Sequence, residues 1–309
     1  MINLDRNKIS SLSNLELLAR QVVEGFITGL HKSPFHGFSV EFAEHRQYNT
    51  GESTRHLDWK LYARTERLYT KRYEEETNLR CRILIDQSPS MYFPYNHKPD
   101  FENPDKITFS IYAAAAITEM LRRQRDAVGL SLFDSEVNLH TQAKSNHRHV
   151  QLLYSYLEKL MEKPKPAKDA HTDVASTFHK IANTIHKRSL VVIFSDMFDH
   201  NEPDELINSL RHLKYNKHEI ILFHITDSRY ELDFDFSNRP YKFIDLETGE
   251  MLKLNPKDVK NQYSKSMREY RDLLKLKCGQ YKIDFVEVDI NKGIKEVLLP
   301  YFLKRQKLY

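Results

Sequence analysis

From residue 79 onward, short apolar segments alternate with longer amphipathic ones, and this alternation constrains the fold more than any other feature. The apolar segments have the length of strands and no polar face, which is typical of strands buried on both sides of a sheet. We expect strands at residues 81–86, 127–133, 190–196, 219–226 and 283–289. We expect helices at about residues 105–124, 148–161, 173–187, 203–214, 256–277 and 293–306. Alternating strands and helices predict an α/β fold with a mostly parallel sheet and helices on both faces.

The segment before residue 79 does not follow this alternation and predicts an N-terminal helix/β extension. Apolar residues recur at helical spacing over residues 12–30, so the extension contains a helix. The predicted division is therefore an extension over residues 1–78 and a main domain over residues 79–309. Within the main domain, residues 241–254 predict an inserted β-hairpin, because two short apolar strands flank a Glu-Thr-Gly-Glu turn.

Composition and charge exclude several classes of function. The chain has 309 residues, of which 29% are charged and 40% hydrophobic, as is ordinary for a soluble globular protein. The formal net charge of +4 gives no reason to expect a nucleic-acid partner. No secretion signal and no apolar stretch long enough to span a bilayer is recognised, so we expect a cytoplasmic protein without direct membrane insertion. Cys81 and Cys278 lie far apart, and we expect reduced, structural thiols.

The first of these strands ends in a group of oxygen-bearing side chains. Asp86 closes the strand at 81–86, and Ser88 and Ser90 follow at alternate positions. Ligands of open parallel sheets bind at the carboxyl edge of the strands. A carboxylate and two hydroxyls at that edge are suitable ligands for a hard cation. An ordinary turn containing Ser and Pro also explains the motif, so this segment alone leaves both interpretations open.

Two later segments add oxygen ligands at the same edge. Thr172 lies in a polar loop before the helix at 173–187, and Asp196 ends the strand at 190–196. Together these segments resemble the metal-ion-dependent adhesion site of von Willebrand factor A domains. The complete set is Asp86, Ser88, Ser90, Thr172 and Asp196. The resemblance implies a von Willebrand factor A-like, Rossmann-like fold and a bound Mg²⁺ or Mn²⁺.

A second signature precedes the first core strand. It contains Glu41-Phe42, Arg46-Gln47-Tyr48, Gly51-Glu52, Arg55-His56-Leu57-Asp58-Trp59 and Ala63-Arg64. Together with the Asp-x-Ser-x-Ser-Met motif, this stretch resembles the bacterial "domain of unknown function 58" family. Members of that family look like von Willebrand A-type modules with an N-terminal extension, and they are associated with MoxR-type AAA+ ATPases.

The chain departs from the family pattern at two places. Gly51-Glu52 stands where the family has Gly-Asp, which keeps the charge on a longer side chain. Ala170 and His171 stand where glycines often precede the threonine, so the backbone before Thr172 has less conformational freedom. The reach of Thr172 to an ion is therefore the weakest part of the predicted site.

The resemblance implies a non-enzymatic, metal-dependent protein-interaction module. In such a site, an open coordination position of the ion accepts an Asp or Glu carboxylate. We expect that carboxylate to come from a MoxR-type AAA+ ATPase or from another protein, with no nucleic acid involved.

The alternative function is a Mg²⁺-dependent hydrolase or phosphotransferase that uses Asp86 and Asp196, because acidic groups with Mg²⁺ support phosphoryl transfer. The chain lacks a Gly-x-x-x-x-Gly-Lys-Ser/Thr loop and a Gly-x-Gly-x-x-Gly fingerprint. Asp86 is also not followed by a second Asp two residues later, as an aspartyl-phosphate site would require. These absences favour the interaction module.

Aromatic residues in both signatures leave further alternatives. Tyr92, Phe93 and Tyr95 follow the serines and form either a rim for a partner or the edge of the core. Trp59 is predicted to anchor the extension, with Asp58 paired to a nearby arginine. The other interpretation is that this group docks an ATPase, since exposed Trp and Arg are common interface hot spots.

Overall fold

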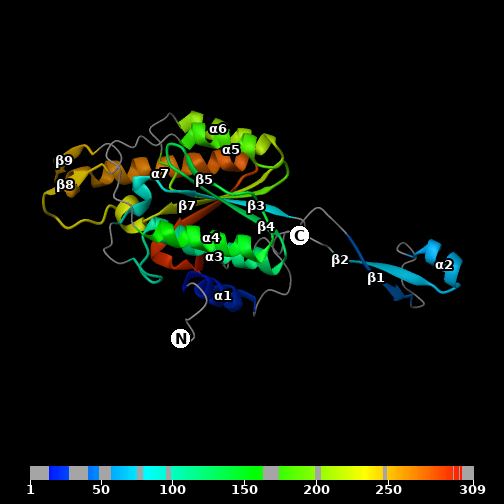
Figure 1. Cartoon of the computed structure of the whole chain (residues 1–309). Coiled ribbons are helices and arrows are strands. Elements are labelled where there is room, and N and C mark those ends of the chain that lie inside the picture. Colours follow the sequence, from blue (N-terminus) through cyan, green and yellow to red (C-terminus); the bar gives the residue numbers. More distant parts are fainter. Residues whose placement is uncertain are drawn as a thin grey trace. The chain divides into compact units, whose positions relative to one another are not determined.

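The computed structural model of the chain describes two compact units (Figure 1). The described residues are 14–27, 41–48, 57–74, 79–94, 99–162, 174–198, 203–245, 249–294, 296–298 and 300. Residues 35–79 form the small unit, and residues 1–34 together with 80–309 form the large unit. The large unit carries most of the predicted site.

The large unit is built on a six-stranded sheet of order β10-β7-β6-β3-β4-β5. The strands are β3 (Arg80–Asp86), β4 (Ala127–Phe133), β5 (Val137–His140), β6 (Leu190–Ser195), β7 (Glu219–Thr226) and β10 (Asp284–Asp289). All neighbouring pairs are parallel except β4 and β5, which are antiparallel. The five predicted strands are confirmed, and β5 is an additional strand that the sequence pattern did not predict.

Helices cover both faces of this sheet (Figure 1). On one face, α5 (Val174–Thr184), α6 (Pro203–Tyr215) and α7 (Pro256–Gln280) share a core with inward residues of the strands. On the other face lie α3 (Lys106–Arg123) and α4 (His147–Met161). These five helices match the predicted ones. The last predicted helix, 293–306, is helical at its described residues 294, 296–298 and 300, and its remainder lies outside the described residues.

The helix α3 is buried on all sides. Every residue from Lys106 to Leu121 is buried, and the small side chains of its alanine run allow close packing. The sheet covers one side of α3, and α1 (Asn14–Ile27) packs against it as a further layer. The contacting stripe of α1 consists of Leu15, Ala19, Val22 and Val23, which are at helical spacing. The helix α1 therefore belongs to the large unit, whereas the sequence division placed it in the extension.

The small unit contains an antiparallel pair, β1 (Glu41–Gln47) and β2 (Tyr69–Glu74), with α2 (Trp59–Thr65) between them in sequence. The carboxylate of Asp58 caps α2, because it accepts hydrogen bonds from Lys60 N and Leu61 N, each at 3.0 Å. Trp59 is 61% exposed within the small unit, and its predicted role as an anchor against the main domain stays a prediction. Arg55 lies outside the described residues.

Short elements complete the large unit near the carboxyl ends of the strands. They are the 3₁₀ turn η2 (Pro89–Tyr92), the π turn η3 (Ser228–Leu232) and the 3₁₀ turn η4 (Ile290–Lys292). The antiparallel strands β8 (Tyr241–Ile244) and β9 (Met251–Leu254) confirm the predicted hairpin. Both cysteines are buried, and neither forms a disulfide with the other. Within the described ranges, no helix combines the length and the apolar character needed to cross a bilayer.

Candidate functional site

Three predicted site residues converge where β3 ends. The backbone N–H of Ser88 donates a hydrogen bond to Asp86 Oδ1 at 2.9 Å, which fixes the turn after the strand. The next turn, η2, brings the hydroxyl oxygens of Ser88 and Ser90 to 3.0 Å from each other. Asp86 and Ser88 are fully buried, so these polar groups are part of the interior of the protein.

The fourth predicted residue, Asp196, follows β6, which is the parallel neighbour of β3. Ser195 links the two strand ends: its hydroxyl donates to Asp86 Oδ2 at 2.6 Å and accepts from Met197 N at 2.8 Å. The N–H of Phe198 donates to Asp196 Oδ1 at 3.2 Å. Ser195 was not among the predicted site residues, although its position at the end of a core strand was a usable signal. Thr172, the fifth predicted residue, lies outside the described residues.

A buried lysine joins this group of acids. Lys106, the first residue of α3, donates from Nζ to Asp196 Oδ2 at 2.7 Å and to Glu231 Oε1 at 2.5 Å. Glu231 comes from η3, and its other oxygen accepts from Asp227 N at 2.8 Å. The lysine side chain is fully buried. Neither Lys106 nor Glu231 was predicted, because both residue types are ordinarily exposed.

Burial is the largest influence on the pKa values of this cluster, and neighbouring charges come second. Burial, and then the charge of Asp196, raise the pKa of Asp86 to about 7, although hydrogen bonds from Ser195 and Ser88 act in the opposite direction. Burial alone would lower the pKa of Lys106, but its two carboxylate partners outweigh this effect and raise it. Burial raises the pKa of Glu231, against the nearby ammonium. Asp196 and Glu231 thus share one ammonium, and Asp86 is a third carboxylate that interacts with Asp196.

The donor set fits a hard divalent cation. With all groups ionised, three carboxylates and one ammonium leave a net charge of −2 in the cluster, which a divalent ion would neutralise. The paired hydroxyls of Ser88 and Ser90 are oxygen ligands of the kind that Mg²⁺ accepts. Among the described residues, no three His, Cys, Asp or Glu side chains are arranged to hold a metal by themselves. An ion here would therefore depend on the serine hydroxyls.

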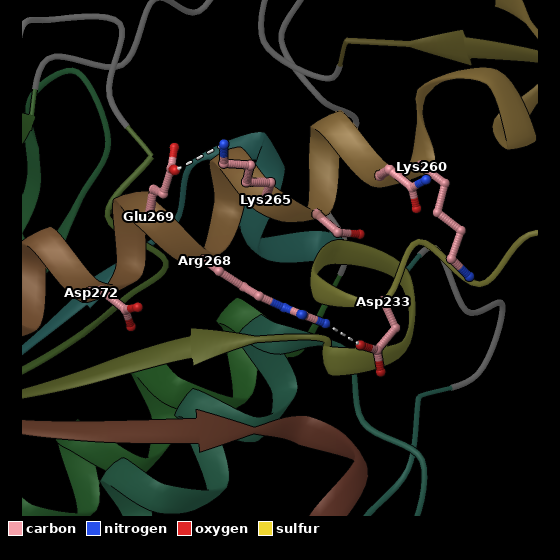
Figure 2. Close-up of a pocket in the computed structure, with 8 residues that line it drawn as sticks. Asp233, Lys260, Lys265, Arg268, Glu269 and Asp272 are labelled. Atoms are coloured by element: carbon pink, nitrogen blue, oxygen red, sulfur yellow. Dashed lines mark hydrogen bonds and ion pairs between the residues drawn. The ribbon is translucent and has the colours of Figure 1, made fainter.

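A separate hollow of about 510 Å³ lies along α7 and is lined by charged side chains (Figure 2). In Figure 2, Arg268 points to Asp233, and these two side chains are 3.2 Å apart. Lys265 lies 3.8 Å from Glu269 on the same helix. All four side chains are more than half exposed, and opposite charges pair with each other. This arrangement is that of a solvated helix face.

Comparisons with known proteins place the chain among uncharacterized relatives. The family model described as "Protein of unknown function DUF58" matches residues 44–272. Uncharacterized proteins of Mycobacterium bovis and Mycobacterium tuberculosis are 23% identical over 227 residues, which cover 73% of this chain and 67% of each relative.

Solved structures give only a distant likeness. The conserved hypothetical protein BatB from Bacteroides thetaiotaomicron has a TM-score of 0.44 at 11% identity, over 74% of this chain and 99% of its own. An aerotolerance-related membrane protein from Bacteroides fragilis has a TM-score of 0.43 at 12% identity, over 75% of this chain and 100% of its own. Likeness at this level supports no argument about the site.

Proposed function

Since this chain belongs to the DUF58 family of proteins of unknown function, we propose a function from its own site: a non-enzymatic, metal-dependent protein-interaction module with a von Willebrand factor A-like fold. The observation that carries the proposal is the buried cluster at the ends of β3 and β6. There, two serine hydroxyls lie beside carboxylates whose charge exceeds that of the one neighbouring ammonium.

Each residue of the cluster has a distinct part in this proposal. Ser88 and Ser90 would hold Mg²⁺ or Mn²⁺ through their hydroxyls, and Asp86 and Asp196 supply negative charge. Lys106 fixes the Asp196 carboxylate, just as the hydroxyl of Ser195 fixes Asp86. When bound, the ion supplies a Lewis-acidic position for an Asp or Glu carboxylate of a partner protein.

We further propose that the partner is a MoxR-type AAA+ ATPase and that the two proteins meet in the cytoplasm. The support for this partner is family membership together with the signature that precedes β3. An adaptor of this kind needs no catalytic group of its own, because the ATPase supplies the energy.

Serine substitutions test the metal site directly. We expect Mn²⁺ to bind the parent protein, and Ser88→Ala and Ser90→Ala each to weaken that binding by about tenfold or more, since each removes an oxygen ligand. Electron paramagnetic resonance of free Mn²⁺ measures the affinity. The matched control is Ser135→Ala, whose hydroxyl contacts Asp134 after the neighbouring strand β4. Equal loss in the control, or no Mn²⁺ binding by the parent, would contradict the proposal.

The partner is tested with a purified MoxR-type ATPase from the same organism. Immobilised parent protein is expected to retain the ATPase in Mg²⁺ buffer, and a chelator or Ser90→Ala is expected to release it. Quantified retention on the resin is the measurement. Retention that is unchanged by chelator would show that no partner carboxylate binds through a metal.

A further inference from the structure

A second hollow, of about 840 Å³, lies beside the site and is mostly apolar. Its walls come from η3, the β8–β9 hairpin and the first turns of α7, and Ser90 lies at its edge. The aromatic rings of Phe234, Phe236 and Phe243 pack on one another with centroids 5.0, 5.2 and 5.6 Å apart. Phe93 packs against Tyr230 at 5.9 Å on the side nearer to the serines. Interlocked rings give the hollow a fixed shape, as preformed binding sites have.

The aromatic residues after Ser90 were predicted to form either a rim for a partner or the edge of the core, and the described ones differ in position. Phe93 lines the hollow, as a rim residue would. Tyr92 is only 6% exposed and belongs to the core. Tyr95 lies outside the described residues.

Exposed apolar side chains continue from this hollow onto the hairpin. Ile244 is 50% exposed, and Met251 and Leu252 are each 61% exposed. Scattered apolar residues on a surface are ordinary, but these three line the same hollow as the packed aromatic rings. A continuous apolar surface that leads into a cavity marks an interaction site.

The charges that line the hollow have one sign. They are the carboxylates of Glu231, Asp245 and Glu250, and among the described residues no Lys, Arg or His belongs to the lining. Glu231 contacts Lys106, and Asp245 and Glu250 add two further carboxylates on the hairpin. A complementary ligand is apolar with a cationic group, since aromatic faces also attract cations.

The hairpin also offers hydrogen-bonding groups. The strands β8 and β9 form a two-stranded sheet, so among the described strands each has a single neighbour and one unpaired edge. Unpaired edges accept extended peptides by strand addition. A volume of about 840 Å³ is large enough for a few side chains of a peptide and too small for a folded domain.

We propose that this hollow binds an extended peptide segment of a partner protein, in which large apolar side chains are followed directly by Arg or Lys. The apolar side chains enter the aromatic hollow, and the cation lies near Asp245 and Glu250. The inference rests on the hollow alone and does not require a metal ion.

The probe is a fluorescein-labelled amidated peptide of sequence Gly-Ser-Leu-Phe-Leu-Arg-Arg, titrated with the full chain and followed by fluorescence anisotropy. We expect saturable binding that a chelator changes by less than about twofold. A peptide with Glu for Arg, and one with Ser for the three apolar residues, are each expected to bind at least about fivefold more weakly, since each loses about 1 kcal/mol or more of contact.

Matched variants assign the binding to this hollow. Leu252→Ser is expected to weaken binding at least about fivefold, whereas Leu276→Ser, which is 59% exposed on α7 outside the hollow, is expected to have no effect. Glu250→Lys is expected to weaken binding of the Arg peptide, and Glu136→Lys is its exposed control.

Absence of saturable binding, equal affinity for the Glu peptide, or equal loss in Leu252→Ser and Leu276→Ser would overturn the inference. The outcome is separable from that of the metal proposal. Mn²⁺ affinity, measured on the same Leu252→Ser protein, is expected to match the parent, because Leu252 contributes no ligand to the ion. Loss of peptide binding with retained Mn²⁺ affinity therefore concerns the hollow only.

Discussion

Replacing Lys106 with methionine is expected to lower the free energy of unfolding by about 3–5 kcal/mol. The reason is that Asp196 and Glu231 would keep their burial but lose the ammonium that both of them contact, at 2.7 and 2.5 Å. Urea denaturation at pH 7, followed by circular dichroism, measures the change. A loss of less than about 1 kcal/mol would show that the ammonium is not what holds these acids in the interior.

Two further proteins serve as controls for this substitution. Lys265→Met removes a lysine that lies 3.8 Å from Glu269, with both side chains exposed, and it is expected to cost less than about 1 kcal/mol. In the double variant Lys106→Met/Glu231→Gln, one of the two orphaned charges is removed as well. We therefore expect the double variant to be more stable than Lys106→Met alone.

The second large effect is a gain in stability. In the presence of a chelator at pH 8, Asp86→Asn is expected to raise the free energy of unfolding by up to about 4 kcal/mol. The folded protein raises the pKa of Asp86 from 3.8 to about 7, so ionising this buried group opposes folding. Asparagine has nearly the same shape and carries no charge to bury. Urea denaturation in EDTA, parent against variant, is the measurement.

The pH dependence of that gain has a definite sign. Between about pH 4 and pH 7, the folded protein keeps a proton on Asp86 that the unfolded chain has released. The stability of the parent therefore falls as pH rises through this window and stays low above it. The advantage of Asp86→Asn is expected to shrink as pH falls from 7 to 4. An advantage that grows toward acidic pH would contradict this account.

Adding a divalent metal ion is expected to reverse the stability order of the parent protein and Asp86→Asn. Mn²⁺ at pH 8 is expected to raise the melting temperature of the parent, since a ligand that binds only the folded state stabilises it. The same addition is expected to leave Asp86→Asn unchanged. A variant that is more stable without metal and unresponsive to it shows that Asp86 is kept for binding and not for folding.

The sequence predicted the sheet because its central strands have no polar face. β3, β6 and β7 are apolar on both sides, and runs of this kind have few alternative structures. β5 was missed because it has only four residues, Val-Asn-Leu-His, and lies half-buried at the edge of the sheet. The same reasoning located Asp86 and Asp196, since strand ends in a parallel sheet meet at one edge.

Lys106 and Glu231 could not be predicted in the same way. They are 125 positions apart, and neither lies in a recognisable motif. The default expectation for a lysine in the first turn of a helix is exposure to solvent. Only the packing of α3 beneath the loops after β6 and β7 makes Lys106 the counter-ion of the cluster.

The packing of α1 on α3 has a consequence for how much of the chain the core of the large unit needs. Since α3 is buried from Lys106 to Leu121, α1 keeps part of its surface from water. A shortened protein without residues 14–27 is expected to expose the surface of α3 that α1 now covers, and to self-associate or accumulate poorly in cells. The helix α1, which precedes the family signature, thus covers part of the hydrophobic core. Substitutions are expected to be tolerated on its solvent-exposed face and not on its buried face.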